Sequence, residues 1–366
     1  MTEVLLKELI HSDIDWLIAT GHRQEIAADT VLIEAGQKSD RLYILLDGTL
    51  IVSVSQAENN PLAKAFAALE GGKPASREIA KLTSGEVAGE IPFIRVRPIA
   101  HTVIAAEKTS ILSIPQQQLA IKLEQDVGFA ARFYRALAIL LSDRLQKLVQ
   151  QLNHSKRDRD RSIRDVLFIL AELHDSDIDW LMATGKQQKI AADTVLIREQ
   201  SPVDALYILL DGIITLSVAE DMRNPLARAF AALDDSATSR EIANLYKGEI
   251  VGETPFIDSR LPATTVKAIV DSLVLSIPRQ QLSVKLQQDI GFASRFYRVI
   301  VTLLSNRLQG MLGQLGYGRR IYSQGQSLDE KIEYEDELEP NLLDRMALAG
   351  TRFNWMLRNL SVTSEQ

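Results

Sequence analysis

The chain has 366 residues, a formal net charge of −7 and no cysteine. The lack of cysteine excludes disulfides, thiolate metal sites and a cysteine nucleophile, and the negative charge argues against a general nucleic-acid binder, which needs a basic face. Apolar residues make up 46% of the chain, enough to bury cores in two or three domains.

The first segment, residues 2–20, has apolar residues at roughly helical spacing and predicts a short helix or helix pair that ends near Gly21. From Gln24 to Val54 the pattern changes to short β-branched or apolar runs, which predict strands. Asp47-Gly48 between two such runs is a strong hairpin signal. The runs are Thr30–Ile33, Leu42–Leu46 and Thr49–Val52.

Residues 55–76 interrupt these strands. Pro61–Leu69 has proline at a helix start and an alanine-rich helical composition, and a similar segment recurs at Pro225–Leu233. The helix is interpreted either as a contact surface or as a surface decoration.

The next stretch, Gly85–Val103, contains the step Gly89-Glu90 followed by a Pro-Phe-Ile turn, and it recurs at Gly248–Val266 with Gly252-Glu253. Glycines permit close approach of a ligand, and free amides at the start of a helical turn suit an anion. The pattern therefore fits a phosphate cradle, but taken alone it favours a tight turn in a β-structure.

Two more strands, Thr102–Ala106 and Ser110–Ile114, precede a helix at Gln116–Glu124 and a longer one at Phe129–Leu152 with an apolar stripe. The charged segment Asn153–Arg164 marks a domain boundary.

The whole order is then repeated. Asp13–Leu17 recurs at Asp177–Leu181, and Leu42–Gly48 recurs at Leu206–Gly212, with an offset of 164 residues that becomes 163 before the Gly-Glu stretch. A period this long indicates two copies of a complete domain. We expect the same strand order in both, in residues 1–152 and 165–315, with a linker at 153–164 and a separate tail at 316–366.

The tail has an acidic segment, Asp329–Glu339, and a predicted helix, Asn341–Leu360, with one apolar face. Such a face either docks on its own protein or binds a partner groove or a second subunit.

Localisation and cofactors follow from absences in the sequence. The beginning, MTEVLLKELI, lacks a basic segment followed by a long apolar one, and no apolar run approaches the roughly 20 residues that span a bilayer. We therefore expect a cytoplasmic protein without membrane insertion. The five histidines show no metal-type spacing, so no metal site is expected.

A helix, about eight short strands with glycine turns, a Gly-Glu loop and two further helices together resemble the cyclic nucleotide-binding domain. The resemblance covers about residues 1–152 and 165–315 and implies an α+β fold: two tandem antiparallel β-rolls, each flanked by N- and C-terminal helices. The tandem arrangement without a helix-turn-helix also resembles a cyanobacterial family described as bacteriocin-type transport-associated proteins.

In nucleotide-binding members, the resemblance implies, the glutamate after glycine binds the ribose 2′-hydroxyl and an arginine holds the cyclic phosphate. Glu90 and Glu253 match the first role, but Ile99 and Pro262 stand at the arginine position. Losing that charge-assisted contact removes roughly 1.5–3 kcal/mol. Arginines do occur two residues earlier. The candidate ligand residues are Gly89, Glu90, Ile91, Arg97, His101 and Thr102 in the first copy, and Gly252, Glu253, Thr254, Arg260, Thr264 and Thr265 in the second.

Two functional hypotheses follow. One is a non-enzymatic regulatory or scaffold protein with degenerate pockets, acting through protein contacts. The other is a sensor that binds a cyclic mono- or dinucleotide and signals through its C-terminal helices. The sequence contains neither a duplicated nucleophile–base pair nor a Walker-type loop, so it gives no indication of an enzyme. The apolar stripes of the two long helices, or the tail helix, also predict a homodimer, with burial of one long helix on the other within one chain as the rival interpretation.

Overall fold

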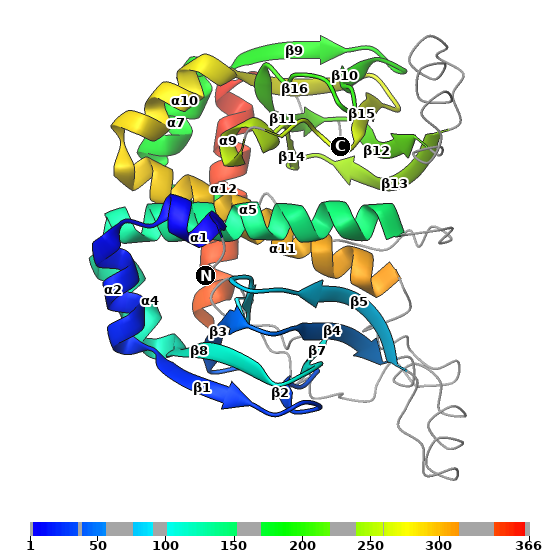
Figure 1. Ribbon diagram of the computed structural model, residues 1–366. Helices are drawn as coiled ribbons and strands as arrows, with labels where there is room; N and C mark the ends of the chain where they lie inside the picture. The colour runs from blue at the N-terminus through cyan, green and yellow to red at the C-terminus, as the bar shows by residue number, and fades with distance from the viewer. Residues whose placement is uncertain are drawn as a thin grey trace, which may run out of the picture. The chain divides into compact units, whose positions relative to one another are not determined.

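The computed structural model describes residues 3–35, 39–55, 76–90, 101–151, 170–219, 239–258, 260–314 and 340–362 (Figure 1). The chain divides into two compact units. The first contains Met1–Asp160 and Ser294–Leu343, and the second contains Arg161–Ala293 and Asp344–Gln366.

The strands of the first unit form two four-stranded antiparallel sheets, in the orders β1-β8-β3-β6 and β2-β7-β4-β5. Alternate residues of these strands point into the roll, where Leu45, Val103 and Ile111 are completely buried. The bounds are β1 (His22–Ile26), β2 (Val31–Ile33), β3 (Arg41–Asp47), β4 (Leu50–Ser55), β5 (Ser76–Leu82), β6 (Val87–Ala88), β7 (Thr102–Ala105) and β8 (Thr109–Pro115).

The second unit repeats this topology, with sheets ordered β9-β16-β11-β14 and β10-β15-β12-β13. The pairing is irregular at equivalent places, between Leu45 and Asp47 in one copy and between Leu209 and Asp211 in the other. The prediction of two β-rolls with one strand order is confirmed. The bounds are β9 (Lys186–Ile190), β10 (Val195–Ile197), β11 (Ala205–Asp211), β12 (Ile213–Ala219), β13 (Ser239–Tyr246), β14 (Ile250–Val251), β15 (Thr265–Ala268) and β16 (Ser272–Pro278).

The helices flank the rolls as predicted, and the first segment is a helix pair that ends at Gly21, whose N–H donates to the Leu17 carbonyl oxygen. The helix predictions at Pro61–Leu69 and Pro225–Leu233, and the charged linker, fall outside the described residues. The bounds are α1 (Glu3–Glu8), α2 (His11–Thr20), α4 (Gln116–Gln125), α5 (Val127–Gln151), α7 (Asp175–Thr184), α9 (Thr254–Ile257), α10 (Arg279–Gln288), α11 (Ile290–Gln314) and α12 (Pro340–Asn359).

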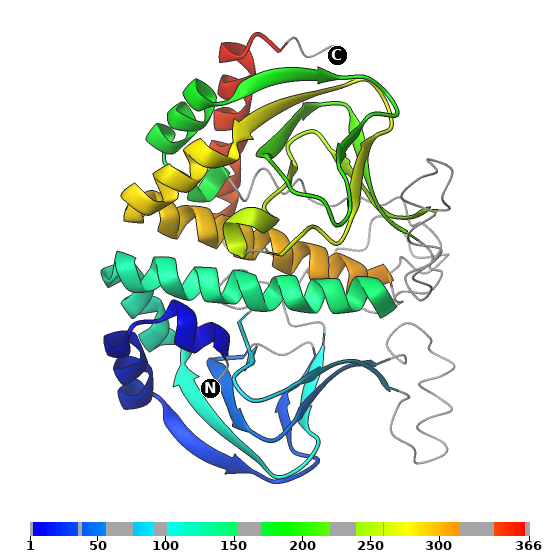
Figure 2. The same ribbon diagram turned by 45° about the horizontal axis from the view of Figure 1, so that its top comes forward.

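The apolar stripes of the two long helices, α5 and α11, are buried within a single chain. From Ser294 onward α11 belongs to the first unit, and this part lies beside α5 in both views (Figure 1, Figure 2). Leu141 of α5 and Leu304 of α11 are 1% and 2% exposed within a single chain. The stripes therefore give no support to a homodimer, which stays a prediction.

The tail helix α12 docks on the second unit, as one of the two interpretations of the tail predicted. Its buried face consists of Ala349, Phe353, Met356 and Leu357. The Arg352 guanidinium donates to the carbonyl oxygens of Leu170 and Leu173, at 2.8 and 2.9 Å, and forms an ion pair of 2.8 Å with Asp175. These contacts fix α12 against the segment that leads into α7.

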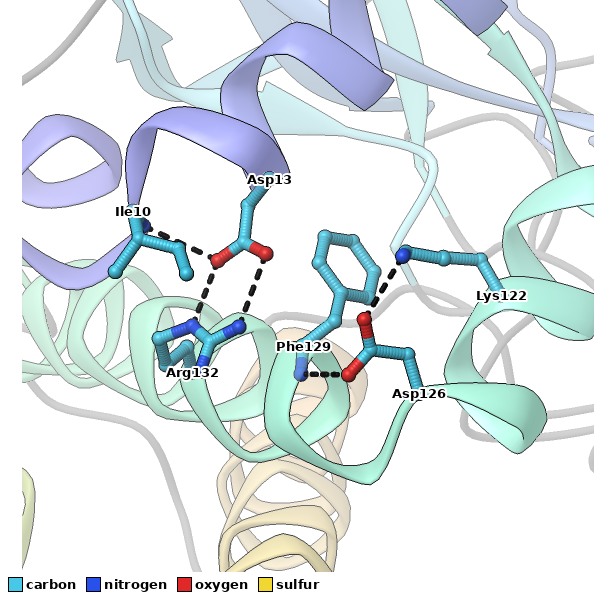
Figure 3. Close-up of polar contacts among 6 residues, drawn as sticks. All are labelled: Ile10, Asp13, Lys122, Asp126, Phe129 and Arg132. Carbon is cyan, nitrogen blue, oxygen red and sulfur yellow. Dashed lines mark hydrogen bonds and ion pairs between the residues drawn. The ribbon is translucent and has the colours of Figure 1, made fainter.

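Two carboxylates fix the helices at one end of the first roll (Figure 3). Asp13, only 2% exposed, accepts two hydrogen bonds from Arg132, at 2.6 and 3.0 Å, and a third from the Ile10 N–H at 3.1 Å. Asp126 accepts from the Phe129 N–H and from Lys122, both at 2.8 Å. The Lys122 bond is the main cause of the lowered pKa of Asp126. Asp13 thus joins α2 to α5, and Asp126 joins α4 to the start of α5.

We expect Asp13→Ala to lower the free energy of unfolding by about 2–4 kcal/mol, because it removes a helix cap and leaves the Arg132 charge partly buried without its carboxylate. Thermal and urea unfolding measure the change. Glu78→Ala is the matched control, since the Glu78–Lys81 pair at 3.6 Å is largely exposed and should contribute little. Equal effects of the two substitutions would contradict this role of Asp13.

Candidate functional site

The Gly-Glu step of the first roll is a left-handed turn at the end of β6. Gly89 has φ = +83°, and a Cβ there would clash with the Arg41 carbonyl oxygen on β3. Only glycine fits this backbone without strain. The turn directs Glu90 into the roll, where the residue is 3% exposed.

The Glu90 carboxylate is bound by the chain itself. Arg144 lies on α5. Its Nη1 donates a hydrogen bond to Glu90 Oε1, and its Nη2 donates one to the Val87 carbonyl oxygen. The side chains of Arg144 and Glu90 are 10% and 4% exposed. A buried carboxylate needs such a partner, because an unpaired charge in the interior is very unfavourable.

The space around this pair is a cavity of about 30 Å³. Its polar side chains are Glu90, His101 and Arg144, and its walls are apolar strand residues closed by Leu148 of α5 and Leu308 of α11. Pockets that hold small ligands usually measure on the order of 300–1,000 Å³. The space that the described residues leave beside this pair is therefore smaller than a usual ligand pocket.

His101 is the third polar group of the cavity. It is 9% exposed, and its Nδ1 has no hydrogen-bond partner in the described part of the chain. Burial lowers the pKa of His101 to about 4, against the opposing effect of the Glu90 charge and with a smaller contribution from Arg144. The imidazole is thus held neutral at physiological pH.

The corresponding stretch of the second roll has the same turn. Gly252 has φ = +87°, and Glu253 is 7% exposed. Thr254 begins the short helix α9. Arg260 forms an ion pair with Asp258 two residues earlier, and burial lowers its pKa.

The remaining candidate residues have structural contacts or lie outside the described residues. The Thr102 hydroxyl accepts from the Ala35 N–H at 3.2 Å, and the Thr265 hydroxyl accepts from the Glu199 N–H at 3.1 Å. Thr264 precedes β15. Ile91 and Arg97, with Ile99, fall outside the described residues. The structure thus brings Glu90 and His101 together in one cavity.

Sequence reasoning missed Arg144. A signal was available, because the run Leu141–Gln146 recurs at Leu304–Gln309 with an arginine at the same place. Residues 141, 144 and 148 lie on one face of a helix, so a cation stood within the apolar stripe. Nothing in the pattern of α5 showed that its partner would be a glutamate 54 residues earlier.

Two structural criteria bear on membrane spans and metal sites. No helix among the described residues combines the length and apolarity needed to cross a bilayer. The histidine, aspartate and glutamate side chains in that part of the chain form no group of three that would suit a metal ion.

Comparison with solved structures gives matches at low identity. The regulatory domain of Toxoplasma gondii PKA, co-crystallised with cAMP, is 15% identical, with 79% of this chain and 89% of that chain covered and a TM-score of 0.28. The regulatory subunit of a cAMP-independent protein kinase A from Trypanosoma brucei is 17% identical, with the same coverage and a TM-score of 0.26. A cyclic nucleotide-binding domain from Methylobacillus flagellatus is 18% identical, with 41% and 79% covered and a TM-score of 0.34.

No curated protein matches the chain in sequence. The narrower resemblance to the bacteriocin-type transport-associated family has no support from these matches. The sequence profile of the cyclic nucleotide-binding domain matches twice, at residues 23–126 and 187–289, which together exceed half of the chain. Since these are the two β-rolls, the chain belongs to the cyclic nucleotide-binding domain family.

Proposed function

We propose that this chain is a non-enzymatic regulatory protein whose first nucleotide pocket is closed by its own helix and which acts through protein contacts. The observation that carries the proposal is the Arg144–Glu90 pair inside a cavity of about 30 Å³. The family resemblance implies that the equivalent glutamate of nucleotide-binding relatives binds the ribose. In this chain the Oε1 of Glu90 already accepts a hydrogen bond from Arg144.

A nucleotide entering this pocket would have to break that pair and move Leu148 away from the cavity. Breaking a buried ion pair is unfavourable by about 3–5 kcal/mol when the freed charge finds no new partner. The ligand phosphate would also lack the usual arginine, because Ile99 stands at that position in the first copy and Pro262 in the second. Both effects weaken binding of a cyclic mononucleotide.

The second candidate function is a sensor of a cyclic nucleotide or another anion. One observation favours it: the cavity retains Arg144, Glu90 and a His101 Nδ1 without a hydrogen-bond partner in the described residues. Apolar side chains would fill such a space more stably than a charged pair. A ligand that bound Arg144 would release Glu90 and shift α5, provided that it bound the open state better than the closed one.

We expect no tight binding of cAMP or cGMP to the full chain. Isothermal titration calorimetry with each nucleotide, and with cyclic dinucleotides, measures it. Sub-micromolar affinity for cAMP or cGMP would refute the closed-pocket proposal. The same titration distinguishes the second candidate, which requires saturable binding of at least one of these ligands.

Substitutions can separate the two reasons for weak binding. We expect Ile99→Arg alone to leave cAMP binding undetected, because α5 still closes the pocket, and Arg144→Gln alone to do the same, because the phosphate partner is missing. The Ile99→Arg, Arg144→Gln double variant should gain affinity of roughly tenfold or more over either single variant. Ile121→Gln, a change at an exposed residue of α4 outside the pocket lining, is the control. If the double variant binds cAMP no more tightly than the two single variants, α5 does not limit access of the nucleotide to the pocket.

The buried His101 predicts a pH dependence. Its folded pKa of about 4 lies below the ordinary 6.5, so the unfolded chain takes up the proton first and stability falls as the pH drops from 6.5 toward 4. By pH 5 the loss is on the order of 2 kcal/mol. Urea unfolding at pH 7 and pH 5 should show it for wild type, and His101→Gln should lose that much less. An identical pH slope in both proteins would contradict a buried neutral imidazole.

A further inference from the structure

His101 shares its cavity with a charged pair whose two members lie on different elements of the first unit. Glu90 follows the Gly89 turn of the roll, whereas Arg144 lies on the helix α5. His101 immediately precedes β7 and is buried. A movement of α5 would therefore take the guanidinium away from the cavity, while the carboxylate and the imidazole would both stay in the roll.

Three effects determine the pKa of His101 while Arg144 is bound to Glu90. Burial lowers it most, the Glu90 carboxylate raises it and the Arg144 guanidinium lowers it, which leaves the pKa at about 4. Separation of Arg144 from Glu90 removes one lowering effect and leaves the carboxylate without its cation. Entry of solvent weakens the other lowering effect, because desolvation penalises the charged form of the imidazole. Each of these changes favours the imidazolium.

Beyond this pair and the imidazole, no charged or titratable side chain among the described residues lines the cavity. The strands β2 and β4, which pair with β7, carry no titratable residue. On β5, Glu78 and Lys81 are largely exposed and pair with each other. Asp143 and Lys147 of α5 and Arg307 of α11 are not among the lining residues. Within this part of the chain, the imidazole is thus the group that can answer a freed carboxylate by taking up a proton.

We propose that opening of the first roll is coupled to the uptake of a proton from solvent by His101, whose positive charge then replaces that of Arg144 beside the Glu90 carboxylate. The closed state has the Arg144–Glu90 pair formed, and the open state has it separated. This coupling rests on the proposed function and adds the proton to it as a regulator. The cavity holds one cation and one carboxylate in both states, so an unpaired charge inside the roll is avoided.

The coupling gives opening a pH dependence of defined sign. The open state binds the proton at a higher pH than the closed state, in which the pKa of His101 is about 4. Between the two pKa values, each fall of one pH unit raises the equilibrium constant for opening by up to about tenfold. Above the upper value the imidazole is neutral in both states, and below the lower value it is charged in both, so the dependence disappears.

The first test follows the imidazole in an NMR pH titration of the full chain with labelled histidine, in which the His101 signal is assigned from its loss in His101→Gln. Arg144→Gln removes the cation of the pair and should raise the pKa of His101 from about 4 to about 5 or higher. Glu90→Gln, Arg144→Gln should raise it less, because the carboxylate charge is also gone. Arg23→Gln is the matched control and should leave it unchanged, since Arg23 is exposed on β1 outside the cavity lining.

The second test measures opening itself, keeps the charged pair intact and uses the absence of cysteine from the chain. Ala88→Cys places a thiol in the cavity lining, and Ile121→Cys places one at an exposed residue of α4. The ratio of their maleimide labelling rates corrects for the pH dependence of thiolate formation. This ratio should rise about threefold or more from about pH 7.5 to about pH 5.5, and His101→Gln should abolish the rise.

Two results would overturn the coupling: a pKa of His101 that stays the same in Arg144→Gln, or a labelling ratio that does not change with pH. The calorimetric titration with cAMP tests the proposed function separately. Tight cAMP binding would refute that function without altering either readout of the coupling, so the two failures are distinguishable.

Discussion

The buried pair between Glu90 and Arg144 is the interaction on which the first domain depends. The Gly89 turn forces the Glu90 carboxylate into the interior of the roll, and a charge there requires a partner. A ligand hydroxyl would serve, but here the partner comes from α5. The same helix also contributes Leu148 to the lining of the cavity, so α5 both satisfies the carboxylate and occupies the space beside it.

Several contacts fix the position of α5. The helix is held at its start by Asp13 and Asp126, and its apolar side packs Phe129, Phe133 and Leu137 with no exposed surface. Moving Arg144 and Leu148 away from the cavity must therefore bend α5 or disturb that packing. A ligand can shift such an equilibrium only by its difference in affinity for the open and closed states. Under the proposed function, the isoleucine at position 99 therefore matters as much as the position of α5.

Much of the fold was predictable, because the repeat indicates two equivalent domains and the pattern of strands and turns resembles the β-roll. The glycine turns recur at Gly48 and Gly212 with φ of +95° and +99°. Two of the three polar side chains of the candidate site were predictable too. Glu90 and His101 occupy the stretch that the turn places in the roll. Arg144 was not, since its contact joins residues 54 positions apart and depends on how α5 lies across the sheet. Local spacing carries no information about that angle.

The same comparison between copies shows where duplication leaves freedom to diverge. Inside the rolls the two domains keep equivalent irregularities in strand pairing and equivalent buried glutamates, because a change there leaves a charge or a void in the core. At the surface the two copies differ more, and Asp175 of the second copy corresponds to His11 of the first. Arg352 of α12 forms its ion pair with Asp175, and the histidine at the equivalent place of the first domain supplies no carboxylate for such a pair. One exchanged residue therefore makes the two domains different binding surfaces for the same helix.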